Sequence, residues 1–224
     1  MPRVSRAQRI TQTMLGACAR AFFMLYLRRV HGLENVRPDR RCIYVSNHIS
    51  LLDTILLGGL FWQRGAYPIL VLGDKAVWST TPLHKLLSRQ IGFLLERGKI
   101  NPDRIHELEE FGRSIAEYQL VVYPEGTRGD GVNVAKCQPG IYHIVQAACA
   151  PIVPVLITNM QTLSMKHGRV HPFAALRKLE VTFGAPIPPD RYVGLSRDEF
   201  TEFVRTQIVA VTKTLESRPD VGAI

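Results

Sequence analysis

The sequence predicts an α/β fold, with one domain built on a central mixed β-sheet flanked by helices and preceded by an N-terminal amphipathic helical segment. Its 224 residues are enough for one domain with a hydrophobic core and too few for two of ordinary size. Hydrophobic residues make up 46% of the chain and charged residues 21%, which excludes disordered and fibrous classes. After residue 41, short apolar runs alternate with stretches of helical periodicity, the pattern of strands packed between helices.

The N-terminal segment has the periodicity of an amphipathic helix that runs to Leu27. Its apolar face consists of Ile10, Met14, Leu15, Cys18, Ala21, Phe22 and Leu25. Arg9, Thr13 and Arg20 fall on the other side of the helical wheel. The apolar part contains an arginine and is shorter than the roughly 20 apolar residues that a bilayer span needs. Two interpretations stay open: a helix packed on its own domain, and an anchor lying in the interface of a membrane.

Six strands are expected, at residues 42–46, 69–72, 92–95, 120–123, 152–157 and 179–183. Asn101 and Pro102 mark a helix start, because asparagine caps the first turn and proline fits the first helical position. Ser196 and Glu199 have the spacing of a capping box and open a helix to about residue 217. A further helix at residues 140–150 precedes the fifth strand, and the prolines that follow it exclude a membrane span there.

The chain is expected to comprise a basic N-terminal helix (residues 1–32), one main domain (33–218) and a flexible tail (219–224). The net charge is +9, and residues 1–41, with nine arginines and two acidic residues, carry +7 of it. A basic end beside apolar residues fits an anionic surface, whether lipid headgroups or nucleic-acid phosphates. The four cysteines show no CxxC spacing and are too sparse for a disulfide scaffold, which favours reduced cysteines in a protein that faces the cytosol.

A histidine and an aspartate follow the first expected strand, in the run NHISLLD (residues 47–53). With seven histidines in the chain, an H-x4-D pair arises by chance about 0.25 times, so its placement matters more than its spacing. At a strand-to-helix junction, Asp53 on the helix can reach one imidazole nitrogen of His48 on the loop. That contact would set the tautomer and leave the other nitrogen to take a proton. The alternative is a histidine that caps the helix beside a solvated Asp53.

A second motif, VVYPEGTR (residues 121–128), ends another expected strand. Its last five residues arise by chance roughly 0.0003 times in a chain of this composition, so the signal is specific. Gly126 lets backbone amides approach an anion closely, Thr127 offers a hydroxyl, and Arg128 supplies a forked donor for phosphate oxygens. Glu125 would repel a phosphate, so we assign it to orienting Arg128 or to binding an acceptor hydroxyl. The alternative is a polar turn with a surface arginine.

These motifs resemble those of the 1-acylglycerol-3-phosphate acyltransferases, within the wider glycerolipid acyltransferases. Four blocks carry the resemblance in the family's order: NHISLLD (47–53), GFLLER (92–97), YPEGTR (123–128) and VPV (153–155). Lys136 and Gly140, between the last two blocks, also look like the family's basic residue and glycine. The first and third blocks are highly specific when they occur together.

The resemblance implies transfer of a fatty acyl group from acyl-CoA or acyl carrier protein to a glycerolipid hydroxyl. His48 is then the general base and Asp53 its support, and the hydroxyl attacks the thioester directly. The residues that correspond to the family's glycerol phosphate site are Arg97, Glu125, Gly126, Thr127 and Arg128, with Lys75 as a further basic residue. No metal or cofactor is implied besides the acyl donor. The implied setting is the cytoplasmic face of a membrane, with a peripheral or monotopic protein on an anionic lipid surface and no nucleic acid.

The chain departs from the family pattern at Glu96, Tyr123 and Gly129, where aspartate, phenylalanine and serine are common. No reacting group is lost, but the acceptor stays open, and glycerol 3-phosphate, another lysophospholipid and a lyso-aminolipid are alternatives to 1-acylglycerol 3-phosphate. A non-catalytic basic module that binds lipid or nucleic acid is the alternative from another class. The chain has no GxSxG elbow, P-loop or dinucleotide fingerprint, which disfavours serine hydrolases, nucleotide hydrolases and dinucleotide-dependent redox enzymes.

Overall fold

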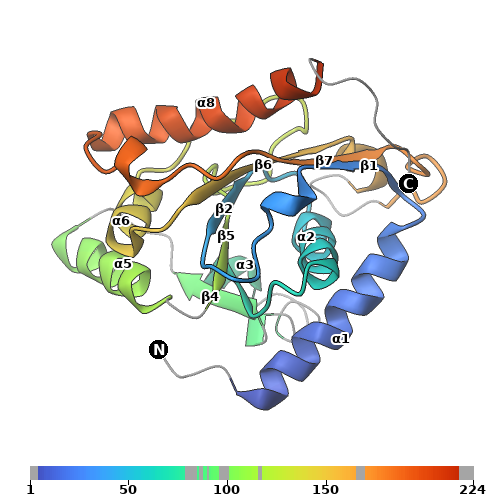
Figure 1. Ribbon diagram of the computed structural model, residues 1–224, viewed down its shortest axis with the longest axis horizontal. Coiled ribbons are helices and arrows are strands. Elements are labelled where there is room, and N and C mark those ends of the chain that lie inside the picture. Colours follow the sequence, from blue (N-terminus) through green and yellow to red (C-terminus); the bar gives the residue numbers. More distant parts are fainter. Residues whose placement is uncertain are drawn as a thin grey trace.

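A seven-stranded mixed sheet lies at the centre of the molecule, with helices on both of its faces (Figure 1). The computed structural model describes residues 5–78, 85, 88–89, 91–95, 101–115, 118–164 and 170–216. Its strands are β1 (Leu27–His31), β2 (Ile43–Ser46), β3 (Ile69–Asp74), β4 (Gly92–Leu95), β5 (Gln119–Val122), β6 (Ile152–Thr158) and β7 (Leu179–Phe183). Its α-helices are α1 (Arg6–Phe23), α2 (Leu52–Gln63), α3 (Lys75–Trp78), α5 (Pro102–Ser114), α6 (Gly140–Ala148), α7 (Met160–Leu163) and α8 (Arg197–Glu216). The predicted α/β class is therefore confirmed.

The strand order is β1-β7-β6-β2-β5-β3-β4. Of the six pairs described, only β6–β7 is antiparallel. The five strands β2 to β6 therefore run in one direction and end at one edge of the sheet. In open α/β sheets, ligands bind in the loops beyond the carboxyl ends of such strands.

Alternate side chains of the strands pack against different helices. Tyr44 of β2 lies in a buried cluster with Leu57 of α2 and Phe23 of α1. Its neighbours Ile43 and Val45 lie in a second cluster, which includes side chains of α5, α6 and α8. All four residues of β2 are buried, as expected for a parallel strand covered on both faces.

The two helix starts predicted from capping residues are confirmed. Asn101 accepts the backbone N–H of Arg104 at 2.8 Å, and α5 begins at Pro102. The backbone N–H of Ser196 donates to the Glu199 carboxylate at 2.8 Å, while the Glu199 N–H donates to the Ser196 hydroxyl at 3.4 Å. This reciprocal pair is the capping box that opens α8. The domain boundary expected near residue 32 stays a prediction, and residues 219–224 lie outside the described part of the chain.

The N-terminal helix is shorter than predicted, because it ends at Phe23 and Leu27–His31 forms the edge strand β1. The backbone N–H of Leu179 donates to the Tyr26 carbonyl at 3.0 Å, which starts the parallel pairing of β1 with β7. β1 is only partly buried. Its sequence, Leu-Arg-Arg-Val-His, therefore does not need the apolar run that is typical of a central strand. That is why its strand character was not predicted.

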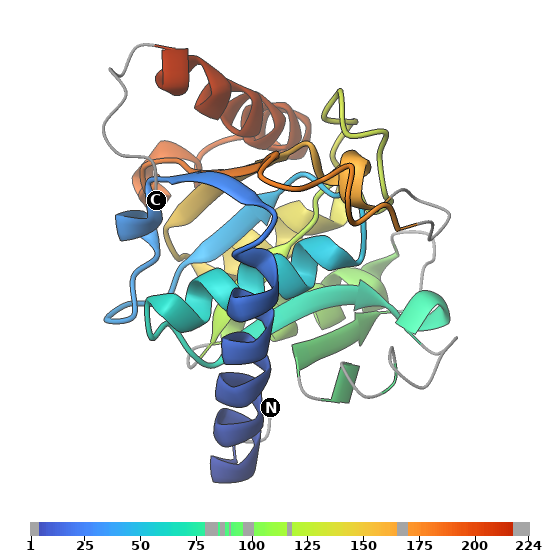
Figure 2. The same cartoon turned by 90° about the vertical axis from the view of Figure 1, so that its right-hand side faces the viewer.

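Helix α1 packs on α2, as Figure 2 shows from the side of α1. The buried residues of α1 are Gln12, Gly16, Ala19 and Phe23. A Cβ atom on Gly16 would clash with the Tyr67 hydroxyl, and one on Gly59 of α2 would lie 2.7 Å from the Arg20 nitrogen. Small residues on both helices therefore allow the close approach. Gln12 is buried because its side-chain amide bonds to the backbone N–H and carbonyl of Ile69, at 3.0 and 3.3 Å.

The predicted apolar face of α1 points away from the domain. Its large side chains are exposed, from 37% for Leu15 to 65% for Met14. The helix therefore packs on its own domain through one side and leaves an apolar surface free on the other, so the two interpretations are compatible. No helix in the described ranges is long and apolar enough to cross a bilayer.

Candidate active site

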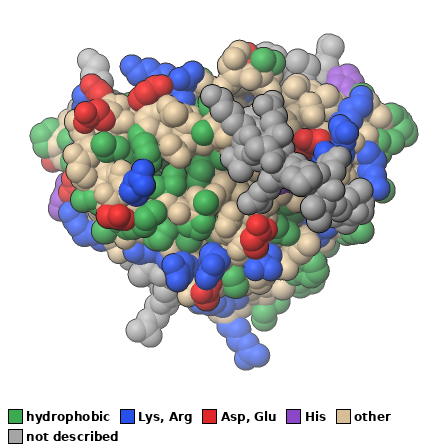
Figure 3. Space-filling model, turned by 45° about the horizontal axis from the view of Figure 1, so that its top comes forward, with side chains coloured by type: hydrophobic (Ala, Val, Ile, Leu, Met, Phe, Trp, Pro, Cys, Tyr) green, Lys and Arg blue, Asp and Glu red, His purple; other side chains and the backbone are tan. Residues whose placement is uncertain are grey.

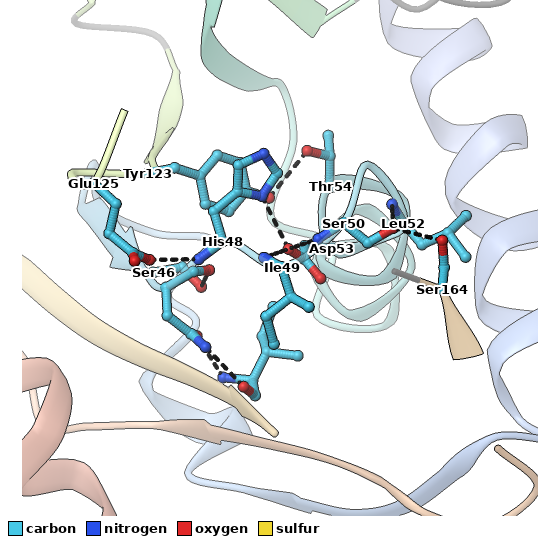
Figure 4. Close-up of polar contacts among 12 residues, drawn as sticks. Ser46, His48, Ile49, Ser50, Leu52, Asp53, Thr54, Tyr123, Glu125 and Ser164 are labelled. Atoms are coloured by element: carbon cyan, nitrogen blue, oxygen red, sulfur yellow. Dashed lines mark hydrogen bonds and ion pairs between the residues drawn. The ribbon is translucent and has the colours of Figure 1, made fainter. Parts of the chain in front are cut away.

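His48 and Asp53 lie together at the carboxyl edge of the sheet, His48 on the connection that follows β2 and Asp53 in the first turn of α2 (Figure 4). Nδ1 of His48 lies 2.9 Å from Oδ2 of Asp53. The Asp53 side chain is completely buried, whereas that of His48 is 18% exposed. The structure therefore brings together the pair predicted from the H-x4-D spacing, with the histidine toward solvent and the aspartate behind it.

The Asp53 carboxylate is held in place by the first turn of α2. Its Oδ2 atom also accepts the backbone N–H groups of Ile49 at 2.6 Å and Ser50 at 2.9 Å. The same oxygen thus accepts hydrogen bonds from the backbone and faces Nδ1 of His48. With Oδ2 as the acceptor, the proton lies on Nδ1, so Nε2 carries the lone pair and is the nitrogen that can accept a proton.

Two motif residues whose roles were not predicted fasten the loop that carries His48, one to β6 and one to the residue that follows α7. The Asn47 side chain accepts the Ile157 N–H and donates to the Ile157 carbonyl, both at 2.8 Å. The Ser50 hydroxyl donates to that of Ser164, just after α7, at 3.0 Å. A single sequence does not reveal these contacts because each joins residues more than 100 positions apart.

Glu125 supports the same loop from the side of β5. Its Oε1 accepts the backbone N–H of His48 at 2.8 Å, and its Oε2 accepts that of Ala135 at 2.9 Å. The loop is closed further by the Gly129 N–H, which donates to the His48 carbonyl at 2.7 Å. The carboxylate is 2% exposed, and burial raises its pKa while the two N–H donors oppose the rise. The Glu125 carboxylate therefore holds the backbone of the His48 loop. Its assignment to Arg128 or to an acceptor hydroxyl stays a prediction.

The imidazole of His48 stacks on the ring of Tyr123, with centroids 4.0 Å apart and ring planes at 19°. The Tyr123 hydroxyl lies 3.0 Å from that of Thr54 on α2. Burial raises the pKa of Tyr123 well above its ordinary value, so the hydroxyl stays neutral. Tyr123 thus orients the imidazole from one face while Asp53 orients it from the edge. In the sequence, Tyr123 stood out only because the family commonly has phenylalanine at this position.

The predicted anion-binding residues follow β5 and β3 at the same edge. Gly126 has φ of +66°, and a Cβ on it would lie 2.8 Å from Cγ of Gln138, so glycine is required there. Thr127 is exposed and Arg128 half-buried on the turn that leads to the Gly129–His48 contact. Lys75 is exposed at the start of α3, directly after β3.

Arg97, the remaining predicted substrate residue, lies outside the described residues. The described members come from the ends of neighbouring parallel strands, because β3 pairs with β5 and β5 with β2. The residues expected to hold phosphate therefore lie along the sheet edge that carries the histidine.

Residues 27–158 match the family model described as Acyltransferase. The chain belongs to the acyltransferase family. The chain is 28% identical over 199 residues to a 1-acyl-sn-glycerol-3-phosphate acyltransferase of Saccharomyces cerevisiae, covering 87% of this chain and 62% of the relative. It is 25% identical to a protein of the same name from Cocos nucifera, over 76% of this chain and 54% of the relative. The chain thus spans less than two thirds of the length of these relatives.

The crystal structure of the 1-acyl-sn-glycerophosphate acyltransferase PlsC from Thermotoga maritima has the same fold, with a TM-score of 0.65 and 24% identity. The match covers 95% of this chain and 81% of that one. The likeness therefore includes α1 and α8 as well as the region matched by the family model.

Proposed function

We propose that this acyltransferase moves a fatty acyl group from acyl-CoA or acyl carrier protein to the free hydroxyl of 1-acylglycerol 3-phosphate, giving phosphatidate. The observation that carries the proposal is the 2.9 Å contact between His48 and the buried Asp53, which leaves Nε2 as a base at the sheet edge. Membership of the family and the names of the relatives support the reaction class and the acceptor. The reaction uses no cofactor besides the acyl donor.

In the proposed step, Nε2 of His48 removes the proton from the acceptor hydroxyl as its oxygen attacks the thioester carbonyl carbon. A C–O bond forms and the C–S bond of the resulting tetrahedral intermediate breaks. The thiolate leaves with the proton that the imidazolium returns. Asp53 stabilises the imidazolium that exists between these two proton transfers. Tyr123 stacks on the ring and keeps it in the orientation that the transfers need.

The acceptor phosphate is proposed to bind to Arg128, Gly126 and Thr127, with Lys75 and Arg97 as further cations. Glycerol 3-phosphate, other lysophospholipids and lyso-aminolipids share parts of this chemistry and are the competing acceptors. An acceptor without a phosphate would leave Arg128 without the anion that suits its forked donors.

We also place the enzyme at the cytoplasmic face of a membrane as a peripheral or monotopic protein. The support is the exposed apolar face of α1, opposite the side that packs on α2. An apolar helix face of this kind lies stably in the interface of a bilayer. The long acyl chains of the proposed substrates also lie in the membrane.

Thiol release from a long-chain acyl-CoA tests the proposal, with purified protein and each candidate acceptor in turn. We expect release that depends on 1-acylglycerol 3-phosphate and a product of the mass of phosphatidate. Faster release with glycerol 3-phosphate or a lyso-aminolipid would replace the acceptor and keep the reaction class. If no acceptor gave thiol release, from either acyl-CoA or acyl carrier protein, the proposed acyltransferase activity would be refuted.

A further inference from the structure

Residues 129–138, which lead from the turn of the predicted anion-binding residues to α6, belong to no helix or strand. Their backbone groups therefore need individual partners. The Gly129 N–H donates to the His48 carbonyl and the Gln138 N–H donates to the Pro124 carbonyl, both at 2.7 Å. The 129–138 segment thus contacts the His48 loop at one end and the beginning of the anion-binding turn at the other.

One peptide group of this segment joins two charged side chains. The peptide between Val134 and Ala135 accepts a hydrogen bond through its carbonyl, from Nε of Arg205 on α8 at 3.1 Å. Its N–H donates to Oε2 of Glu125 at 2.9 Å. The other carboxylate oxygen of Glu125 accepts the backbone N–H of His48 at 2.8 Å (Figure 4). A chain of hydrogen bonds therefore leads from Arg205, through one peptide group, to the backbone of the residue proposed as the base.

The charges at the two ends of this peptide suit its dipole. A cation at the carbonyl and a carboxylate at the N–H both polarise the group, so each hydrogen bond strengthens the other. Burial raises the pKa of Glu125, and the Ala135 N–H is the strongest of the hydrogen-bond donors that oppose this rise. Arg205 therefore supports the donor that most favours the charged form of Glu125.

The segment is held against α8 by burial on either side of this peptide. Val134 and Cys137 are 9% and 3% exposed and lie in the cluster that includes Phe200 of α8. Ala135, between them, is exposed, so the peptide lies where water competes for its carbonyl. Arg205 gives this carbonyl a fixed partner.

Arg205 is itself oriented by its own helix. Its Nη1 atom donates at 3.0 Å to Oε1 of Glu202, one turn earlier on α8. The guanidinium group is planar, so a bond at Nη1 also sets the direction of the Nε–H bond. The Arg205 side chain is 40% exposed, and that of Glu202 is 63% exposed.

We propose that Arg205 is a positioning residue for acyl transfer, which holds the backbone of His48 in place through the 134–135 peptide and Glu125. The inference rests on the proposed function in that His48 is the base there. It extends the site beyond residues 27–158, which match the family model, to helix α8.

Two substitutions separate the hydrogen bond from the charge. In Arg205→Gln, the amide nitrogen is as many bonds from Cα as Nε of arginine, so a neutral donor can stay at the Val134 carbonyl. Arg205→Met keeps a side chain of similar length without a donor. We expect kcat for phosphatidate formation to fall about tenfold in the methionine variant and less than about threefold in the glutamine variant, because small displacements of a catalytic group are costly.

The split between kcat and KM decides what kind of role Arg205 has. The KM values for acceptor and acyl donor should change by less than about twofold in both variants, since the base is displaced and no substrate contact is lost. A higher KM with an unchanged kcat would place Arg205 in substrate binding and would overturn the proposal. Equal losses of kcat in the two variants would also overturn it, because the charge would then matter and not the hydrogen bond.

Arg197→Met is the matched control, because it makes the same substitution in the first turn of α8. Arg197 is 51% exposed and lies 3.6 Å from Asp198. Figure 3, in which the top of Figure 1 comes forward, shows acidic and basic side chains interspersed over the side of the molecule that carries α8. One charge lost from such a mixed surface should change kcat less than about twofold. A tenfold loss in this control would overturn the specific role of Arg205.

Val211→Ala controls for a general loss of stability. The side chain is 4% exposed, and a Cβ atom on Gly184 would lie 3.0 Å from its Cγ2. It lies about 9 Å along the helix from Arg205. The cavity in this variant should lower Tm by at least as much as Arg205→Met does, while kcat stays within about twofold. Losses of kcat that follow Tm across the variants would mean a merely structural role and would overturn the proposal.

Hydrogen exchange followed by mass spectrometry tests the same contact without any substrate. In Arg205→Met, the amides of His48 and Ala135 should exchange about tenfold faster than in the unmutated protein, whereas Arg205→Gln should leave them nearly unchanged. Unchanged exchange of both amides in Arg205→Met would overturn the role of Arg205. Because this measurement needs no turnover, faster exchange in a protein that transfers no acyl group would refute the proposed function and keep the contact.

Discussion

Tyr123 and His48 form a stacked pair, with ring centroids 4.0 Å apart and planes inclined by 19°. Together with the contact from Asp53 to Nδ1, this stacking fixes the orientation of the imidazole. Nε2 is then the ring nitrogen available to a substrate. The hydroxyl of Tyr123 bonds to Thr54, one residue after Asp53, so both supports of the histidine come from or reach the first turn of α2. The imidazole is thus held between α2 and the residue that directly follows β5.

Tyr123→Phe and Tyr123→Leu separate the ring from the hydroxyl. Phenylalanine loses one hydrogen bond, which should cost about 0.5–1.5 kcal/mol of stability. Because it keeps the ring that stacks on the imidazole, kcat should change by less than about threefold. Leucine removes the flat surface against which the imidazole lies, and kcat should fall about tenfold or more, since small misplacements of a catalytic group are costly. Equal kcat values for the two variants would show that stacking does not position the base.

Asp53→Asn tests the tautomer of His48. The amide removes the charge that supports the imidazolium and favours the ring with the proton on the wrong nitrogen. We expect kcat to fall about 10³-fold or more, the scale seen when the orienting carboxylate of a catalytic histidine is replaced. Circular dichroism of the variant checks that the fold is kept. A kcat within about tenfold of the unmutated enzyme would contradict an orienting role for Asp53.

Glu125→Gln tests the carboxylate that holds the His48 loop. One amide oxygen cannot accept N–H groups on both sides, so an unsatisfied buried donor should cost about 1–3 kcal/mol of stability, measured by urea denaturation. Tm should fall with it. A change of less than about 0.5 kcal/mol would show that the two hydrogen bonds are not needed to keep the loop in place.

The same variant changes the pH dependence of stability. Burial raises the pKa of Glu125 above its ordinary value of 4.5, so the folded protein keeps this proton to a higher pH than the unfolded chain. Between 4.5 and the folded-state pKa, the free energy of unfolding contributed by Glu125 therefore falls as pH rises. Glutamine does not titrate, so urea denaturation of the variant should show a flatter dependence across this window. Parallel curves would contradict the raised pKa.

Arg128→Ala is expected to raise the KM for the phosphorylated acceptor about tenfold or more, with kcat changed much less, because a charge-assisted hydrogen bond to phosphate is lost. Arg191→Ala is the control for loss of one positive charge, because Arg191 lies four residues after Ile187, which pairs with Ile152 at the amino end of β6. The KM for the acyl donor should stay the same in both variants. A rise in that KM instead would place Arg128 at the donor.

The interior of the fold followed from local patterns, whereas its edges did not. β2 and β6 are short apolar runs covered on both faces, and the starts of α5 and α8 carry their own capping residues. Such features depend on neighbours within a few positions. β1 was missed because its five residues become a strand only through pairing with β7, about 150 residues later.

At the site, the sequence placed His48 and Asp53 together because they are five residues apart on one strand-to-helix turn. It could not show that Glu125 holds the His48 backbone, because that hydrogen bond joins residues 77 positions apart. The same holds for the orientation of α1. Its helical wheel showed an apolar face but not that Gly16 and Ala19 lie on the side that packs on α2.

The most direct test of His48 as the base compares His48→Ala with the unmutated protein in phosphatidate formation from acyl-CoA and 1-acylglycerol 3-phosphate. We expect product from the unmutated protein and a loss of about 10³-fold or more in the variant, with the fold intact by circular dichroism. Phosphatidate formed by His48→Ala at a rate near that of the unmutated enzyme would contradict the assignment of His48 as the base.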